Sequence, residues 1–297
     1  MKKLGSDDVV CGFLSVTDGS IVLADGNTAI DLSEYAVWSG YLRHWSGRRV
    51  CAQVMDERDY RTGKKLLHVW PETKASQAPF VELYYNERLV KYIASTFGHL
   101  AVNVNGAVFN FSHLMNECEM LTCQDYFYRP ALGRFAPDPA TGRFNVEDPQ
   151  RPYLDKFGRL FMRTVHAARL EEIDTSKFHE YYANELRTIH STPCHPARPE
   201  KYRDFSFFSR SCATIIRDGL RANGFRNVRG VLPREVFISA MWEFRKSAGK
   251  QGVCFSYRRM PQLKVDEAPH SSLSPILNPV NAIRRIILRS SEEGCRK

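Results

Sequence analysis

The sequence lacks any long apolar run. No stretch approaches the roughly 18–20 consecutive apolar residues that a membrane-spanning helix requires, so no transmembrane segment is expected. The chain begins with Lys2 and Lys3 and then turns polar, and the apolar stretch 9–16 is short and interrupted. We therefore expect no signal peptide. The chain would be cytoplasmic as synthesised, and a target outside the cell would require a dedicated secretion system.

The chain also lacks the compositional bias of disordered, collagen-like or coiled-coil proteins. Of its 297 residues, 43% are hydrophobic and 25% are charged, which are ordinary values for globular proteins. The eight cysteines are irregularly spaced, unlike those of a small secreted disulfide scaffold, so we expect reduced thiols. The length suits two domains of roughly 100–200 residues each.

Positive charge is in moderate excess. The 42 Lys and Arg residues exceed the 33 Asp and Glu residues, which gives a formal net charge of +9. Such a charge favours association with any anionic surface and does not choose among nucleic acid, lipid and cell-wall polymer. We do not expect nucleic acid as the partner, but a non-catalytic basic nucleic-acid-binding protein remains an alternative function.

The residue pattern of the sequence changes near residue 75. Residues 1–75 contain short β-rich segments separated by Asp-Gly turns, which predict a small barrel-like accessory or targeting domain. Residues 71–79 have linker chemistry. Residues 76–270 read as an α+β domain, and residues 271–297 as a basic C-terminal helix or tail. That helix would dock on the core with its arginines solvated, or lie on a membrane surface or a partner helix.

Helical signals recur through the second domain. The residue pattern favours helices over 81–95, 160–173, 179–189, 211–222 and from 233 toward 245. The fourth ends at Asn223-Gly224, a common C-terminal signal, and the fifth opens at Pro233, which suits a first helical turn.

The strongest local signal is a hairpin around Asn105-Gly106. A two-residue turn pairs Val104 with Ala107, and the alternation then puts His99 and Asn110 on one face of the hairpin, as diagonal neighbours roughly 7–8 Å apart. An amide oxygen that holds an imidazole fixes the ring's tautomer and orientation, as a general base requires. With a longer turn, Ser112 or His113 would replace Asn110 as the third residue.

A nucleophile is available at Cys212, at the start of the helix predicted over 211–222. Helix N-terminal N–H groups, a nearby His⁺ and the charge of Arg210 would lower the pKa of this thiol. The same N–H groups would stabilise the oxyanion of an acyl intermediate. Cys212, His99 and Asn110 thus form a candidate Cys–His–Asn triad.

Other chemistries find little support. Cys118 and Cys123 with His113, or the pair Cys194-His195, do not have the spacing of paired zinc ligands. No phosphate-cradling loop and no dinucleotide fingerprint occur. The sequence therefore predicts neither a metal nor a cofactor.

Several short motifs resemble a known group. Phe97-Gly98-His99, the segment 108–112 with Asn110-Phe111, and the segment 202–218 with Ser211-Cys212 look like motifs of the circularly permuted branch of the papain-like NlpC superfamily. The resemblance spans roughly residues 80–225. It implies a papain-like fold with Cys212 as nucleophile, His99 as base and Asn110 as the orienting residue.

The resemblance also implies an activity. Members of this superfamily are cysteine peptidases or amidases, often acting on the stem peptides of bacterial cell walls. The expected substrate is therefore a peptide, and a cell-wall target would suit an antibacterial effector with an immunity or secretion-system partner. The alternative within the same chemistry is a thiol-dependent acyltransferase or thioesterase on lipid-like substrates.

Overall fold

The computed structural model describes residues 4–294 apart from 6–7, 18, 27, 60–61, 74–77, 91–95, 133–152, 159–161, 250–251 and 265–267. The chain forms two compact units. The first comprises Met1–Ala75, Gln124–Phe161 and Lys264–Ala268, and the second comprises Ser76–Cys123, Met162–Leu263 and Pro269–Lys297. Both helices and strands are abundant, which confirms the α+β class.

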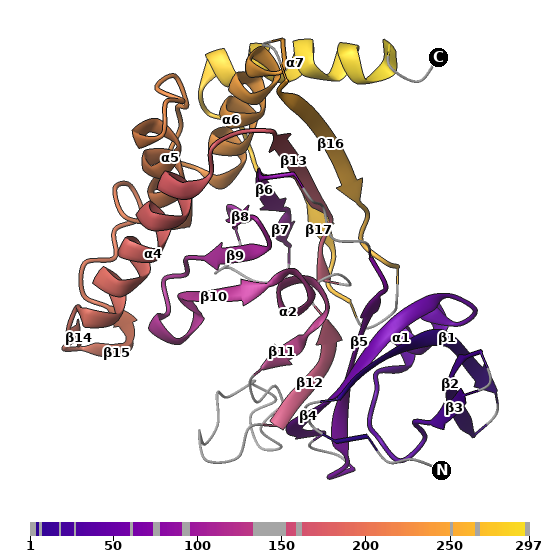
Figure 1. The fold of residues 1–297 in the computed structure, drawn as a ribbon. Helices are drawn as coiled ribbons and strands as arrows, with labels where there is room; N and C mark the ends of the chain where they lie inside the picture. The colour runs from indigo at the N-terminus through magenta and orange to yellow at the C-terminus, as the bar shows by residue number, and fades with distance from the viewer. Residues whose placement is uncertain are drawn as a thin grey trace. The chain divides into compact units, whose positions relative to one another are not determined.

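The first unit is built on one open sheet (Figure 1). Its strand order is β11-β12-β4-β1-β2-β3, with β5 also paired to β4. The elements are β1 (Val9–Thr17), β2 (Ser20–Asp25), β3 (Thr28–Asp31), α1 (Ser39–Trp45), β4 (Arg49–Asp59), β5 (Lys65–Pro71), β11 (Pro130–Leu132) and β12 (Tyr153–Gly158). The helix α2 (Cys123–Tyr128) leads into β11.

Two predictions about this unit are wrong. The strands described here form no closed barrel, because β3 and β11 remain the two ends of the sheet. The predicted second domain, 76–270, also contains segments that belong to the first unit, since β12 pairs in parallel with β4 and in antiparallel with β11. The pairing of β12 with β4 joins residues about 100 positions apart, so the local sequence carries no signal for it. The predicted boundary near residue 75 falls within 74–77, outside the described residues.

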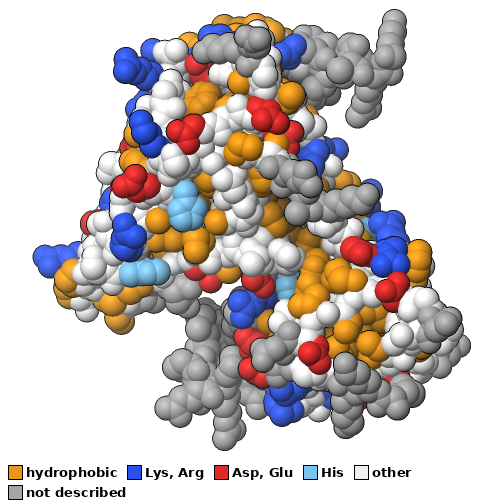
Figure 2. Space-filling view, viewed as in Figure 1, with side chains coloured by type: hydrophobic (Ala, Val, Ile, Leu, Met, Phe, Trp, Pro, Cys, Tyr) orange, Lys and Arg blue, Asp and Glu red, His pale blue; other side chains and the backbone are white. Residues whose placement is uncertain are grey.

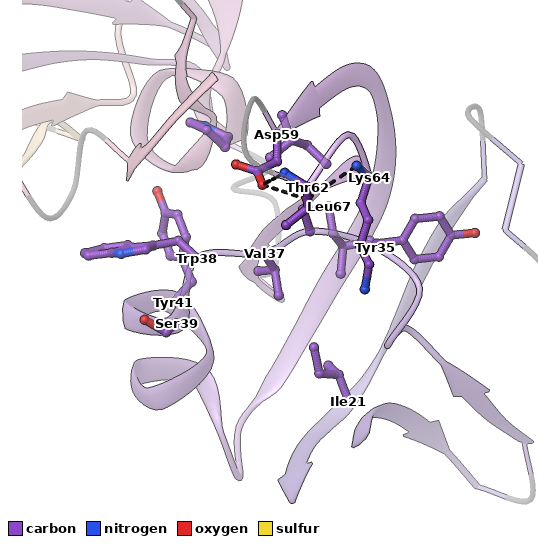
Figure 3. Close-up of a pocket in the computed structure, with 13 residues that line it drawn as sticks. Ile21, Tyr35, Val37, Trp38, Ser39, Tyr41, Asp59, Thr62, Lys64 and Leu67 are labelled. Carbon is purple, nitrogen blue, oxygen red and sulfur yellow. Dashed lines mark hydrogen bonds between the residues drawn. The ribbon is translucent and has the colours of Figure 1, made fainter. Parts of the chain in front are cut away.

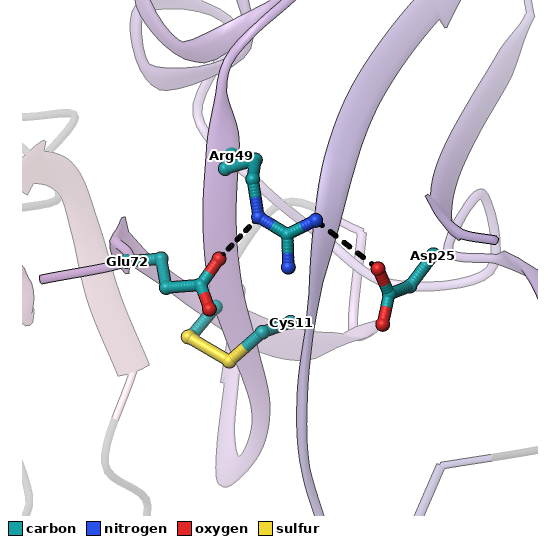
Figure 4. Close-up of a disulfide and its surroundings, with 5 residues drawn as sticks. Cys11, Asp25, Arg49 and Glu72 are labelled. Atoms are coloured by element: carbon teal, nitrogen blue, oxygen red, sulfur yellow. Dashed lines mark hydrogen bonds and ion pairs between the residues drawn. A yellow bond between two sulfur atoms is a disulfide. The ribbon is translucent and has the colours of Figure 1, made fainter.

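A disulfide joins two neighbouring strands of the first unit. Cys11 on β1 lies directly opposite Cys51 on β4, and the two sulfur atoms are bonded (Figure 4). Beside it, Arg49 binds Asp25 at 3.1 Å and Glu72 at 2.6 Å. The expectation of reduced thiols is therefore wrong for this pair, because sheet register brings together two cysteines that are 40 positions apart.

The second unit packs three helices on an antiparallel sheet (Figure 1). The strand order is β10-β9-β8-β6-β13-β16, and α4, α5 and α6 supply the other side of the core. The strands are β6 (Phe80–Asn86), β7 (Arg88–Leu89), β8 (His99–Val104), β9 (Ala107–Asn110), β10 (Glu119–Thr122), β13 (Val165–Glu171), β14 (Cys194–His195), β15 (Arg198–Tyr202), β16 (Cys254–Met260) and β17 (Ser271–Ser272). The helices are η2 (Met115–Glu117), α4 (Ser176–Ser191), α5 (Cys212–Ala222), α6 (Pro233–Ser247) and α7 (Pro279–Gly294).

Two of the predicted helices are wrong. The first part of 81–95 forms β6, and half of 160–173 forms β13, which pairs with β6 along its whole length. Residues 91–95 and 160–161 of these two predictions lie outside the described residues. All seven residues of β6 are buried, so the strand lacks the polar alternation by which a half-exposed strand is recognised. The predicted helices 179–189, 211–222 and 233–245 are confirmed as α4, α5 and α6.

No helix in the described part of the chain is long and apolar enough to cross a bilayer. On the face drawn in Figure 2, basic and acidic side chains are interspersed over the described surface. The net positive charge is therefore not gathered into one continuous patch on that face.

Candidate active site

The hairpin that carries His99 has the predicted register. Val104 pairs with Ala107, and Ala101 pairs with Asn110. The turn residues Asn105 and Gly106 have φ values of 53° and 98°, as a type I′ turn requires. The face formed by Leu100, Val102, Val104, Phe109 and Phe111 lies in the core. The opposite face is buried as well, because Ala101 and Asn103 are almost inaccessible.

Gly98 sets the position at which β8 begins. Its φ is 74°, in the left-handed region that favours glycine. A Cβ atom at this position would lie 2.5 Å from the carbonyl oxygen of Asn86, the residue that pairs with His99 across β6 and β8. Glycine therefore permits both the backbone turn and the close approach that start the strand at His99.

His99 and Asn110 are joined directly. The distance from His99 Nε2 to Asn110 Oδ1 is 2.6 Å, and Asn110 Nδ2 donates to the carbonyl oxygen of Glu117 at 2.8 Å. Because the amide nitrogen is committed to a carbonyl, the amide oxygen faces the ring and must accept its proton. Nε2 therefore carries the hydrogen, and Nδ1 is the basic nitrogen of the neutral imidazole.

The start of α5 is fixed by a capping box. The hydroxyl of Ser211 accepts from the backbone N–H of Thr214, and the hydroxyl of Thr214 accepts from the backbone N–H of Ser211. Thr214 is fully buried. This reciprocal cap satisfies the N–H groups of Ser211 and Thr214, and the N–H groups of Cys212 and Ala213 act to lower the pKa of the cysteine thiol.

Cys212 and His99 line one cavity of about 110 Å³. The backbone N–H of Leu100, the residue that follows His99 on β8, is near enough to the Cys212 thiol to lower its pKa. The start of β8 and the start of α5, which are more than 100 positions apart in the sequence, therefore meet at this cavity. The amide of Asn110 bonds to Nε2 of the His99 imidazole. The three predicted residues thus converge at one end of the sheet.

The predicted ionisation of Cys212 is wrong. Burial raises the pKa of this thiol above that of an ordinary cysteine, although backbone N–H groups and the charge of Arg163 act in the opposite direction. Arg210 does not supply free positive charge, because it binds Asp204 at 2.6 Å and Glu185 at 2.8 Å. The resting thiol is therefore protonated at neutral pH and needs a base to become a nucleophile.

The two alternative third residues make contacts of their own. Ser112 and His113 both line the cavity, but Ser112 Oγ donates to Glu117 Oε2 at 2.7 Å, and the His113 ring packs 6.0 Å from that of Phe205. Asn110 Oδ1 lies 2.6 Å from Nε2 of the His99 ring. This distance supports Asn110 as the orienting residue.

Half of the residues that line the cavity are aromatic or aliphatic: Phe97, Phe111, Phe205, Phe207, Val231 and Pro233. The other half are Gly98, His99, Ser112, His113, Ser211 and Cys212. Phe97 and Phe207 pack with their ring centroids 4.9 Å apart. The segment 231–233, at the start of α6, also reaches the site, and no sequence signal pointed to it.

Sequence reasoning also missed a cavity of about 340 Å³ in the first unit (Figure 3). Buried Trp38, Tyr41 and Leu67 contribute to its lining. Its polar rim is bonded within the hairpin, since Asp59 Oδ2 accepts from both the N–H and the hydroxyl of Thr62.

Among the described residues, no group of three or more His, Cys, Asp or Glu side chains is arranged to hold a metal ion. Comparison of the chain with protein-family models, with curated proteins and with solved structures finds no match. The geometry of the site and the short motifs around His99, Asn110 and Cys212 are therefore the features that bear on function.

Proposed function

We propose that the protein is a cysteine hydrolase that cleaves amide bonds through Cys212, His99 and Asn110. The observation that carries this proposal is the hydrogen bond from His99 Nε2 to Asn110 Oδ1, beside a cavity that His99 shares with Cys212. With its hydrogen on Nε2 in this bond, the neutral His99 ring has Nδ1 as its proton acceptor. The resemblance to the permuted NlpC-type enzymes points to the same three residues and to a papain-like arrangement of the second unit.

The reaction begins with the neutral thiol. His99 Nδ1 takes the proton of Cys212 as the sulfur attacks the amide carbonyl, so the base acts during the attack and no resting thiolate is needed. The N–H groups of Cys212 and Ala213, in the first turn of α5, are the donors we assign to the oxyanion. The C–N bond breaks, and His99 passes its proton to the leaving amine.

Water completes the cycle. It attacks the thioester carbonyl, the C–S bond breaks, and the carboxylic acid is released while the proton returns to Cys212. The expected substrate is a peptide amide, with bacterial cell-wall stem peptides as the class that the resemblance suggests. An effector role with an immunity or secretion-system partner belongs to the same proposal.

A library of short peptides and muropeptides tests this function. Release of new amino termini should depend on Cys212 and His99, and should be abolished in Cys212→Ala while Cys194→Ala, which removes an exposed thiol, retains full activity. Cleavage by the Cys212→Ala variant would contradict the proposal.

The apolar lining of the cavity favours one alternative. Phenylalanines around the thiol also suit the acyl chain of a lipid-like thioester or amide, on which the same site would act as an acyltransferase or thioesterase. Mass spectrometry of the products from acyl thioesters, with and without an added amine acceptor, distinguishes hydrolysis from transfer.

A further inference from the structure

The loop between β15 and α5 carries aromatic side chains that reach the cavity of Cys212. Phe205 and Phe207 line this cavity. Phe208 is 74% exposed, and its ring packs edge-on against that of Phe207, with the ring centroids 5.1 Å apart. We call residues 205–210 the aromatic loop. It extends an aromatic surface from the cavity of the thiol to the solvent.

Hydrogen bonds close the aromatic loop. Ser206 and Arg210 exchange two backbone hydrogen bonds, of 3.2 and 2.8 Å. The Tyr202 hydroxyl donates to the carbonyl oxygen of Arg210 at 3.1 Å, which ties the loop to the end of β15. The exposed ring of Phe208 is therefore held on a fixed backbone, and less conformational entropy is lost when a ligand packs on it than on a free chain end.

The cavity of Cys212 is too small to enclose a whole substrate. Its volume is about 110 Å³, whereas pockets that enclose a drug-sized ligand measure about 300–1,000 Å³. The residues of a peptide that flank the scissile amide must therefore lie partly outside the cavity. Phe97 and Phe208 both pack on Phe207, with centroid distances of 4.9 and 5.1 Å, so these three rings offer the neighbouring apolar surface.

The charge of the aromatic loop is already paired. Arg210 is the one charged residue among 205–210, and its guanidinium binds the carboxylates of Asp204 and Glu185 at 2.6 and 2.8 Å. A charged side chain of a substrate would lose hydration on this surface without gaining a free partner in the loop. A large apolar side chain instead removes its own surface and that of Phe208 from water.

We propose that Phe207 and Phe208 form a subsite for a large apolar side chain of the substrate, at a residue beside the amide that Cys212 attacks. The inference rests on the proposed hydrolase and names its substrate class, peptides with leucine, phenylalanine or a similar residue at the cut. Phe208 is then a specificity-determining residue. Because it lies one ring beyond the cavity, its replacement should change the choice of substrate and leave the chemistry at Cys212 intact.

Cleavage of a peptide library, with the products identified by mass spectrometry, tests this subsite. The wild type should cut next to leucine or phenylalanine at least about tenfold more efficiently, by kcat/KM, than next to glycine. Phe208→Ala should lose about tenfold on the apolar peptides and stay within about twofold on the glycine peptides. Phe13→Ala, which removes an exposed phenylalanine of β1, is the matched control and should keep the preference of the wild type.

Acylation of Cys212 by p-nitrophenyl acetate separates this inference from the function on which it rests, because an acetyl group carries no side chain that could pack on Phe208. Equal acylation rates in the wild type and Phe208→Ala, together with the lost preference, would support the subsite. An active wild type without a preference for apolar residues, or an unchanged preference in Phe208→Ala, would overturn the subsite alone. Absence of Cys212-dependent acylation and cleavage would overturn the proposed function as well. Intact peptides, combined with acylation by p-nitrophenyl dodecanoate that Phe208→Ala slows, would overturn the peptide assignment in favour of an acyl chain.

Discussion

Replacing Asn110 by alanine tests the geometry of the site most specifically. The substitution removes the hydrogen bond of 2.6 Å to His99 Nε2 and that of 2.8 Å to the Glu117 carbonyl. Water reaches both partners in part, since His99 and Glu117 are not buried residues. We therefore expect a decrease of only about 1–3 kcal/mol in the free energy of unfolding, the cost of one or two weakened polar groups.

The effect on the proposed chemistry should be larger. Without the amide oxygen, the His99 ring rotates and samples both neutral tautomers, so Nδ1 is no longer held as the base. A displacement of about 1 Å at a reacting group costs on the order of 100-fold in rate. We expect a comparable decrease in the rate at which a p-nitrophenyl ester acylates the enzyme.

Asn103→Ala is the matched control. Asn103 lies on the same hairpin face, is also buried, and bonds to Tyr84 Oη, Cys123 Sγ and the N–H of Gly106. This variant should lose at least as much stability and keep the acylation rate. Nitrogen-15 NMR of the imidazole should show the Nε2–H tautomer in the wild type and a mixture in Asn110→Ala. A wild-type ring protonated on Nδ1, or an unchanged rate in Asn110→Ala, would refute the reasoning.

Three further predictions concern the strand start, the thiol and the disulfide. Gly98→Ala should lower the free energy of unfolding, measured in urea, by about 1–3 kcal/mol more than Gly224→Ala does. Both positions have positive φ, but of the two only Gly98 has a backbone atom 2.5 Å from the position of the added Cβ. Equal losses of stability in the two variants would contradict this. Because burial raises the pKa of Cys212, its thiolate forms only at a pH above the range in which ordinary cysteines ionise. Iodoacetamide should therefore label Cys212 more slowly than exposed Cys194 at pH 7, and the labelling rate of Cys212 should still increase beyond pH 9. A labelling rate that reaches its plateau below pH 7 would instead indicate a resting thiolate. The disulfide spans 40 positions, and loop-closure entropy predicts that such a bond stabilises the folded state by about 4 kcal/mol. The variant Cys11→Ala/Cys51→Ala should therefore have a lower melting temperature in calorimetry. Titration of the unfolded wild type should give two more thiols with reductant than without. Identical thiol counts would exclude the bond.

The sequence predicted those parts of the site that depend on neighbours along the chain. Asn105-Gly106 determines its own turn, and the register of the hairpin follows from the turn, so the placement of Asn110 beside His99 was predictable. The start of α5 depends on Ser211 and Thr214, which are three positions apart. These are short-range interactions, and pattern reasoning captures them.

The remainder depends on contacts between distant segments. β6 was predicted as a helix because a strand buried on both faces has no alternating pattern. β13 is identified through its pairing with β6 and β16, which are distant in the sequence. The Cys11–Cys51 bond requires the register of β1 on β4. The raised pKa of Cys212 depends on how deeply α5 packs, which the helix-terminus argument from sequence did not include.

The most direct test of the central claim is the mass of the enzyme after brief reaction with a p-nitrophenyl ester. We predict a single added acyl group, located by peptide mapping on Cys212, formed quickly in the wild type and in Cys194→Ala and lost in His99→Ala. Acylation distributed over several cysteines, or proceeding at the same rate without the imidazole of His99, would contradict the claim that these two side chains act together.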